Sequence, residues 1–232
     1  MCMDGHPAAW PQAVIFDLDG TLIDSAPDIA ESLNEVLGRR NLPPFALPDV
    51  KRMLGAGIPA LITRALAAHG VEAGDVKPLV ADMIGVYALR ATRLTLPFDG
   101  AVERLREFHR DGVKMAVCTN KQQHVTDIIL RDLNIAQYFS CAIGARPELA
   151  RKPDPAMIHL ALDAMGTPPA RAVMVGDSSA DAGAAKAAGL PVVLAAFGYS
   201  TTPVADFGPD AIIASFAELP AVLRRLSANG SA

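Results

Sequence analysis

The sequence is poor in cysteine, with only Cys2, Cys118 and Cys141 among its 232 residues. Their positions match neither a disulfide framework nor a metal-ligand spacing, which predicts free thiols in a reducing compartment. The chain also lacks an apolar run long enough to cross a bilayer. Its first residues, MCMDGHPAAWPQ, contain neither a basic segment nor an apolar core, so we expect no signal peptide. These absences predict a cytoplasmic protein without a membrane partner.

An excess of positive charge is absent as well. The chain has 21 Lys and Arg against 25 Asp and Glu, a net charge of −4, which argues against a nucleic-acid partner. Hydrophobic residues make up 51% of the chain and charged residues 20%, which is enough for a buried core without disorder. The length allows one large domain, or one domain with a smaller companion, and we expect a monomer or a homodimer.

Short apolar runs predict buried parallel strands. They are rich in β-branched residues, are separated by helical patterns, and lie at 13–16, 113–118, 172–175, 191–196 and 211–213. Strands that alternate with helices predict an α/β protein with a doubly wound, Rossmann-like parallel sheet as its core.

One interval interrupts this alternation. Between about residues 26 and 93 the sequence shows helical patterns such as DIAESLNEVLGRR and IPALITRALAAHG, and no convincing strand. An ordinary crossover is the alternative explanation, but such connections are normally far shorter. We therefore expect a small inserted α-helical cap domain at 24–94, with hinges near 21–25 and 94–98. The hydrolase core would comprise 10–23 and 95–232.

Polar side chains follow three of the predicted strands. The stretch AVIFDLDGTLIDS places Asp17 and Asp19 directly after the first strand. Thr119, Asn120 and Lys121 follow the second strand, and Asp177, Ser178 and Asp181 follow the strand at 172–175. Lys152 lies in the loop RKPDP between these two strands. Because parallel strands point the same way, these side chains should meet at one edge of the sheet. Carboxylates beside a lysine suit Mg²⁺ and a phosphoryl group, since Mg²⁺ binds through one or two carboxylates and shares oxygens with phosphate.

The four motifs DLDGT, Thr-Asn after a strand, the lysine loop and GDSSAD resemble, in this order, those of the haloacid dehalogenase superfamily. The resemblance covers about residues 13–190 and is to the phosphatase branch with a helical cap after the first motif. It implies magnesium-dependent hydrolysis of a small phosphorylated metabolite through an aspartyl-phosphate intermediate. Dehalogenation is not expected, because halide departure needs no protonation and true dehalogenases lack the second aspartate.

The resemblance implies a role for each of three aspartates. Asp17 corresponds to the nucleophile that attacks phosphorus. Asp19 corresponds to the general acid/base, which protonates the leaving alkoxide and then takes a proton from the attacking water. Asp17, the main-chain carbonyl of Asp19, and Asp177 are the implied magnesium ligands. Without the resemblance, Asp17 would be interpreted as a helix cap and Asp19 as a turn residue before Gly20.

The remaining polar residues are expected to support this chemistry. Thr119 and Asn120 should bind the phosphoryl oxygens, or cap the helix that begins near residue 122, or both. Lys152 should neutralise the nucleophile and the phosphoryl oxygens. Ser178 and Asp181 are expected to hold the metal ligands in place. Direct metal binding by Asp181 is the open alternative.

Within the superfamily, the runs IDSAPDIAESLNEVL and LGAGIPALI resemble phosphoglycolate phosphatases, which remove phosphate from 2-phosphoglycolate. The carboxylate of that substrate needs a cation or exposed backbone donors. Main-chain N–H groups near Gly55 and Gly57 could serve, as could Lys51 or Arg52. Arg64 and Arg90 are further cations of the cap, and each could equally be a solvated helix charge.

The sequence is also compatible with two alternative functions. One is a phosphomutase of the β-phosphoglucomutase kind, or a phosphatase for sugar phosphates or N-acetylmuramic acid 6-phosphate, since the same frame serves many substrates. The other is a catalytically silent binding or regulatory protein on this scaffold. The presence of both Asp17 and Asp19 argues against a silent protein.

Overall fold

The computed structural model describes residues 10–55 and 57–229. Its main sheet has six strands in the order β5-β4-β1-β6-β7-β8, and each neighbouring pair is parallel. The strands of this sheet are β1 (Ala13–Phe16), β4 (Lys114–Gln122), β5 (Cys141–Ala145), β6 (Ala172–Gly176), β7 (Val192–Ala195) and β8 (Ala211–Ile213). The predicted doubly wound, Rossmann-like α/β fold is confirmed.

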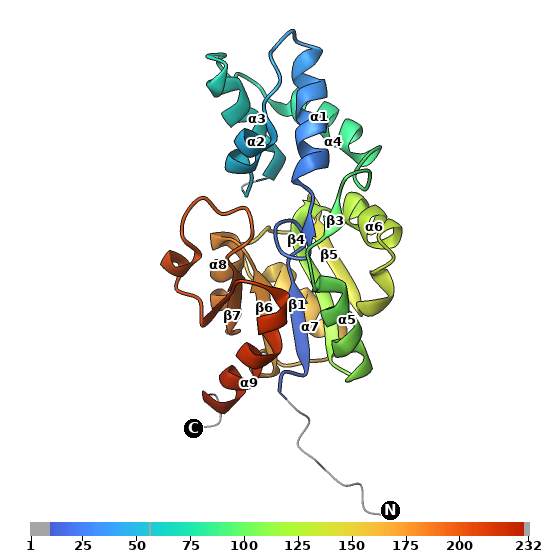
Figure 1. Ribbon diagram of the computed structural model, residues 1–232, viewed down its shortest axis with the longest axis vertical. Coiled ribbons are helices and arrows are strands. Elements are labelled where there is room, and N and C mark those ends of the chain that lie inside the picture. Colours follow the sequence, from blue (N-terminus) through green and yellow to red (C-terminus); the bar gives the residue numbers. More distant parts are fainter. Residues whose placement is uncertain (1–9, 56, 230–232) are drawn as a thin grey trace, which may run out of the picture.

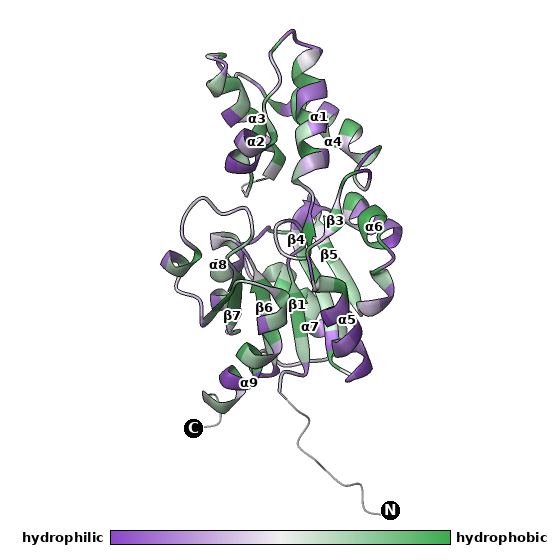
Figure 2. Cartoon of the chain, viewed as in Figure 1, coloured by the Kyte–Doolittle hydropathy of each residue, from purple (hydrophilic) through white to green (hydrophobic). Residues whose placement is uncertain are grey.

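Helices cover both faces of this sheet (Figure 1). They are α5 (Ala101–Arg110), α6 (Gln123–Asp132), α7 (Ala156–Met165), α8 (Ser179–Ala187) and α9 (Leu219–Asn229). Side chains alternate along β1, so Val14 and Phe16 pack in one apolar cluster, with α5, α6 and α9, while Ala13 and Ile15 pack in another, with α7 and α8. Burial on both faces explains why the strands are continuous apolar runs, shown in green in Figure 2.

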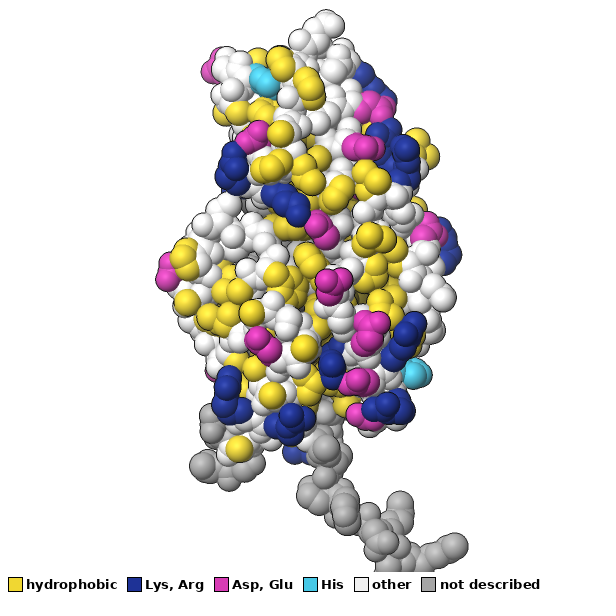
Figure 3. All heavy atoms as spheres, in the orientation of Figure 1, with side chains coloured by type: hydrophobic (Ala, Val, Ile, Leu, Met, Phe, Trp, Pro, Cys, Tyr) yellow, Lys and Arg dark blue, Asp and Glu magenta, His cyan; other side chains and the backbone are white. Residues whose placement is uncertain are grey.

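Four further helices lie together beyond one edge of the sheet, at the top of Figure 1. They are α1 (Ala26–Gly38), α2 (Leu47–Met53), α3 (Gly57–Ala68) and α4 (Lys77–Ala88), and we refer to them as the cap. Helix α4 contacts both α1 and α3, and α2 contacts α1 and α3. Their shared interior contains Leu33, Leu61 and Met83. On the face drawn in Figure 3, acidic and basic side chains are interspersed over both cap and core.

The chain leaves and re-enters the core at one place. Strand β2 (Ile23–Asp24) pairs antiparallel with β3 (Leu96–Pro97), which makes a short two-stranded ribbon between the cap and the sheet. Asp28, at the start of α1, is fully buried, and its Oδ2 accepts hydrogen bonds from Leu94 N at 2.9 Å, Thr95 N at 2.8 Å and Thr95 Oγ1 at 2.7 Å. This carboxylate therefore ties the outgoing chain to the returning chain.

Strand β5 was missed by the sequence analysis. Its residues, CAIGA, are few and carry little β-branched character, so the run gives no local signal. The strand forms because it pairs with β4. Gly144 is required there, since a Cβ at this position would lie 2.6 Å from the backbone Cα of Gln123.

The second predicted strand also proved longer than expected. β4 continues through Thr119, Asn120 and Lys121 to Gln122, and its register with β5 shifts between Cys118 and Gln122. This irregularity re-aims the side chains at the carboxyl end of β4, as β-bulges commonly do beside active sites.

Cys118 and Cys141 are free thiols in the structure, and Cys2 lies outside the described residues, as does most of the N-terminal segment considered above. Among residues 10–55 and 57–229, none of the helices combines the length and the apolar character that crossing a membrane requires.

We expect Asp28→Ala to lower the free energy of unfolding by about 3 kcal/mol, because it leaves buried donors at residues 94 and 95 without their acceptor. Glu31→Ala is the matched control, since Glu31 is an exposed carboxylate on the same helix. The control should change stability by less than about 0.5 kcal/mol. Urea denaturation of both variants measures the difference, and equal losses would contradict the proposed tie between the two chain segments.

Candidate active site

Asp17 and Asp177 lie on either side of the point where the strand order of the sheet reverses. β1 leads directly into Asp17, and its neighbour β6 leads into Asp177. The backbone N–H of Asp17 donates to Val175 O at 2.9 Å, which fixes the end of β1 against β6. In open α/β sheets, ligands bind at such a switch point, outside the carboxyl ends of the strands.

A cavity of about 100 Å³ lies at this edge, between the core and the cap. Most of the residues singled out from the sequence line it: Asp17, Asp19, Gly55, Gly57, Thr119, Asn120, Lys152, Asp177 and Ser178. The structure therefore brings residues from three strand ends, one loop and the cap to a single site.

Three carboxylates gather at the base of this site. Single oxygens of Asp17, Asp177 and Asp181 lie within 4.8 Å of one another. Lys152 stands among them, with Nζ 3.0 Å from Asp17 Oδ1 and 2.6 Å from Asp181 Oδ1. Nζ also donates to the carbonyl oxygen of Cys118 at 2.6 Å, so all three of its N–H groups have partners. The side chain is only 1% exposed, so the lysine is held rigidly in place.

Burial and charge act in opposite directions on these groups. Burial raises the pKa of Asp17, which the Lys152 ammonium lowers in part and Asp181 raises again, to a value of about 6. Burial and the charges of Asp181 and Asp17 also raise the pKa of Asp177 well above its ordinary value. Burial alone would lower the pKa of Lys152, but the charges of Asp17 and Asp181 hold it above its usual range. The site is thus short of positive charge.

The two oxygens of Asp181 are both occupied by protein donors. Oδ1 receives Lys152, while Oδ2 accepts from Asp177 N at 3.1 Å, Ser178 N at 3.0 Å and Ser178 Oγ at 2.6 Å. Ser178 and Asp181 also form the capping box at the start of α8. This saturation favours a supporting role for Asp181, with Ser178, over direct metal binding.

The other two carboxylates keep capacity for a further ligand. No hydrogen bond from the described residues reaches Asp17 Oδ2, and Asp177 accepts only one bond at each oxygen, from Thr21 Oγ1 at 3.1 Å and Tyr199 N at 2.8 Å. Three carboxylates against one lysine leave two negative charges uncompensated, which equals the charge of one divalent cation. The residues present therefore fit Mg²⁺, with Asp17 and Asp177 as the candidate ligands.

Glycine backbones hold the Asp177 side chain from two sides. A Cβ at Gly198 would lie 2.3 Å from Asp177 Cβ, and a Cβ at Gly20 would lie 2.4 Å from Asp177 Oδ2. Gly20 also has a φ of +82°, which favours glycine. Any side chain at either position would displace this carboxylate.

Thr119 and Asn120 differ in what they can offer a ligand. The Asn120 amide clamps the lysine loop, because Oδ1 accepts from Lys152 N at 3.0 Å and Nδ2 donates to Lys152 O at 2.9 Å. Thr119 Oγ1 accepts a bond from Lys121 N at 3.3 Å and retains its own proton as a donor. Thr119 is therefore the stronger candidate for a phosphoryl oxygen, and Asn120 positions Lys152.

Lys121 has a position in the site that the sequence did not indicate. In the structure, its Nζ donates to both oxygens of Asp19 at 2.8 Å, and Ser25 Oγ donates to Asp19 Oδ1 at 2.5 Å. Burial by itself would lower the pKa of Lys121, but the negative charge of Asp19 outweighs it and raises the pKa to about 12. Its place after the strand was visible in the sequence, but the re-aiming of β4 that turns it toward Asp19 was not.

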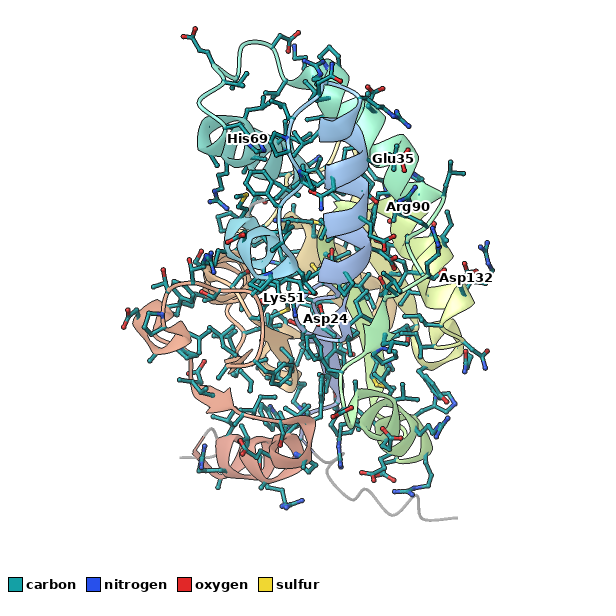
Figure 4. The ribbon with its side chains drawn as sticks, turned by 45° about the horizontal axis from the view of Figure 1, so that its top comes forward. Asp24, Glu35, Lys51, His69, Arg90 and Asp132 are labelled. Atoms are coloured by element: carbon teal, nitrogen blue, oxygen red, sulfur yellow. The ribbon has the colours of Figure 1, made fainter. Side chains whose placement is uncertain are left out.

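Lys51 and Arg52, the cap residues expected to bind the substrate carboxylate, do not line the cavity. Lys51 Nζ instead pairs with Asp24 Oδ2 at 2.8 Å, and Arg52 pairs with Asp49 on the exterior. Figure 4 shows the Asp24–Lys51 pair where the cap meets the core. The Lys51–Asp24 contact joins residues far apart in the sequence and could not be predicted from spacing, whereas Asp49 and Arg52 are an i,i+3 pair on α2. Gly55 and Gly57 are the two expected cap residues that do line the cavity.

Two further cations of the cap are held elsewhere. Arg90 pairs with Glu35, farther along the cap in Figure 4. Arg64 Nη1 donates to the carbonyl oxygens of Met53 at 2.6 Å and Leu54 at 3.3 Å.

Comparison with known proteins agrees with this geometry. The family model for haloacid dehalogenase-like hydrolases matches residues 14–195. The chain belongs to the haloacid dehalogenase-like hydrolase family.

Relatives in this family cover nearly the whole chain. A phosphoglycolate phosphatase of Caulobacter vibrioides is 41% identical over 89% of this chain and 88% of its own length. A phosphoglycolate phosphatase of Rhodospirillum rubrum is 38% identical over 90% and 89%. Among solved structures, one described as a predicted phosphoglycolate phosphatase from Haemophilus somnus superposes with a TM-score of 0.84 at 30% identity, and the match covers 91% of this chain and 97% of that one.

For this haloacid dehalogenase-like hydrolase we predict that Mg²⁺ binding weakens in acid. Because the pKa of Asp17 is raised to about 6, the metal-free site carries a proton on Asp17 below that pH. Mg²⁺ must displace this proton and any proton on Asp177, whose pKa is also raised, so its apparent affinity should fall at least about tenfold per pH unit below about pH 6. Calorimetric titrations between pH 5 and pH 8, in buffers of differing ionisation enthalpy, measure both affinity and proton release. Constant affinity across that range would contradict the prediction.

A second prediction concerns the glycines beside Asp177. Gly198→Ala should weaken Mg²⁺ binding at least about tenfold, or about 1.4 kcal/mol, because the new Cβ overlaps the Asp177 side chain. Gly85→Ala is the control, since a Cβ at this helical position in the cap would meet no atom within 4 Å. Isothermal titration of both folded variants compares them. Unchanged affinity in Gly198→Ala would show that Asp177 binds the ion without the support of this close glycine contact.

Proposed function

We propose that this protein is a magnesium-dependent phosphomonoester hydrolase that converts 2-phosphoglycolate to glycolate and phosphate. The observation that carries the proposal is the pair Asp17 and Asp19, which line one cavity with Lys152 beside the first of them. The relatives named as phosphoglycolate phosphatases support the substrate. We also propose that residues 24–94 act as a cap domain whose closure excludes water.

Asp17 is the proposed nucleophile. Its Oδ1 is held by Leu18 N at 2.7 Å and by Lys152, which leaves Oδ2 to attack phosphorus. The leaving oxygen departs as the Asp17–phosphorus bond forms, and an aspartyl-phosphate results. Thr119 would donate its hydroxyl proton to a phosphoryl oxygen, and the Lys152 ammonium, held beside Asp17, would offset the negative charge that develops there. When bound, Mg²⁺ would supply further positive charge at the same oxygens.

Asp19 is the proposed general acid/base. It would give a proton to the departing alkoxide and later take one from the water that cleaves the aspartyl-phosphate. Its hydrogen bonds from Lys121 and Ser25 fix the carboxyl group two residues beyond the nucleophile. Such positioning matters because proton transfer requires hydrogen-bond contact with the reacting oxygen.

The size of the cavity favours a small ester. Its volume of about 100 Å³ lies well below the several hundred Å³ typical of pockets for larger ligands. From the cap, Ile29, Ile58, Leu61 and Met83 contribute an apolar wall. A sugar phosphate or a nucleotide would require the cap to move outward, whereas a two-carbon acid would not.

The first test compares kcat/KM for 2-phosphoglycolate with that for sugar phosphates, N-acetylmuramic acid 6-phosphate and nucleotides, with Mg²⁺ present. We expect a preference of about a hundredfold, or about 2.7 kcal/mol of transition-state discrimination. A flat or sugar-favouring profile would overturn the substrate. Conversion of a sugar 1-phosphate without phosphate release would indicate a mutase, and no turnover of any ester would indicate a silent binding protein.

A second test concerns the nucleophile. Asp17→Asn should abolish turnover, because the amide cannot form the aspartyl-phosphate, while the fold is retained. Phosphate release and circular dichroism of this variant provide the measurement. The control is Asp49→Asn, an exposed carboxylate of the cap that pairs with Arg52. Activity retained in Asp17→Asn would remove Asp17 from this role.

A further inference from the structure

We propose that Tyr87, on cap helix α4, recognises the carboxylate of the substrate through its hydroxyl group, with the ammonium of Lys121 beside it. This inference rests on the proposed function and specifies which residues select the substrate. Tyr87 and Lys121 both line the cavity, one from the cap and the other from the end of β4.

The first observation is an unpaired hydroxyl. Tyr87 is 2% exposed, and no hydrogen bond from the described residues reaches its hydroxyl oxygen. A buried polar group without a partner is unfavourable in the free protein, so native structures rarely keep one without a reason. Burial raises the pKa of Tyr87, which the Lys121 ammonium lowers in part, to about 12. The hydroxyl therefore keeps its proton at neutral pH and can donate it to an acceptor.

The second observation is that Tyr87 differs in polarity from the other cap residues of the cavity wall. Among the described residues that line the cavity from the cap, it is the one with a polar side chain, and its neighbours are glycine or apolar, including Ile58, Leu61 and Met83. The other tyrosine of the lining, Tyr199, already donates to Asp24 Oδ1 at 2.7 Å and accepts from Ala26 N at 3.0 Å. A substrate group that needs a side-chain donor from the cap therefore meets Tyr87.

The third observation is the adjacent positive charge. Lys121 Nζ lies 4.5 Å from the centre of the Tyr87 ring and is 4% exposed. Its two bonds to Asp19 leave one of its three N–H groups, and the ammonium also interacts with the Tyr87 side chain, so the two donors lie together. A hydroxyl donor next to an ammonium donor suits an anionic acceptor such as a carboxylate better than a neutral hydroxyl or an apolar group.

The position of Lys121 also indicates how the substrate is oriented in the site. Because Lys121 holds Asp19, the proposed proton donor to the leaving oxygen, the donor pair lies on the leaving-group side of the site. In 2-phosphoglycolate the carboxylate is one carbon from the leaving oxygen. A carboxylate bound there would bring that oxygen to Asp19, so recognition and proton transfer would share one contact region.

The test compares 2-phosphoglycolate with ethyl phosphate, in which a methyl group replaces the carboxylate. We expect Tyr87→Phe to lower the ratio of their kcat/KM values at least about tenfold, because only the carboxylate loses a donor. Tyr138→Phe, which removes the same hydroxyl group from a core residue that does not line the cavity, should leave the ratio within about twofold. The melting temperature of Tyr87→Phe should equal or exceed that of the wild type, since the variant removes an unpaired hydroxyl.

The outcomes separate the inference from the function on which it rests. A wild-type ratio near one would overturn the phosphoglycolate assignment and the role of Tyr87 together. A high wild-type ratio that survives in Tyr87→Phe would leave the substrate standing and overturn the role of Tyr87. Equal loss of activity toward both esters in Tyr87→Phe would also overturn it, since it would indicate a structural contribution alone.

Discussion

The ion pairs of Lys152 are the interaction on which the rest of the site depends. Buried carboxylates repel one another, and one ammonium with three short contacts is what allows Asp17 and Asp181 to stand side by side. Much of the surrounding structure serves this lysine. Asn120 clamps its main chain from β4, and the capping box of α8 fixes Asp181 as its partner. Removing Lys152 would leave the buried carboxylates of Asp17 and Asp181 without their compensating charge.

A second charge pair divides the work of the site. Lys121 pairs with Asp19, so the proposed acid/base has a compensating charge of its own beside the excess negative charge around Asp17. The two aspartates are two residues apart in sequence, yet each has its own lysine from a different element. Each carboxyl group is therefore positioned by its own cation, which suits the separate roles proposed for the nucleophile and the acid/base.

The sequence was sufficient for the features that depend on local pattern. Continuous apolar runs predicted five strands, and the polar residues at the carboxyl ends of β1, β4 and β6 identified the edge at which they meet. Features that depend on tertiary contact escaped. β5 forms only by pairing with β4, and the partners of Lys51, Lys121 and Tyr87 lie on other elements. The positive charges of Lys51 and Arg52 therefore predicted a contact with the substrate, whereas each side chain forms an ion pair with an aspartate.

Burial of the charged side chains is unfavourable for folding, but it strengthens their contacts with a bound phosphoryl group. The cap covers the strand ends with apolar side chains, and burial is the main cause of the raised pKa of Asp17. A low dielectric strengthens every charge contact in the cavity, including those to a phosphoryl group. Opening the cap would admit water, lower that pKa and weaken those contacts together. The two-stranded ribbon of β2 and β3 connects the cap to the core, and Asp28 holds its two chain segments together. Its geometry would therefore affect both access to the site and the strength of the charge contacts within it.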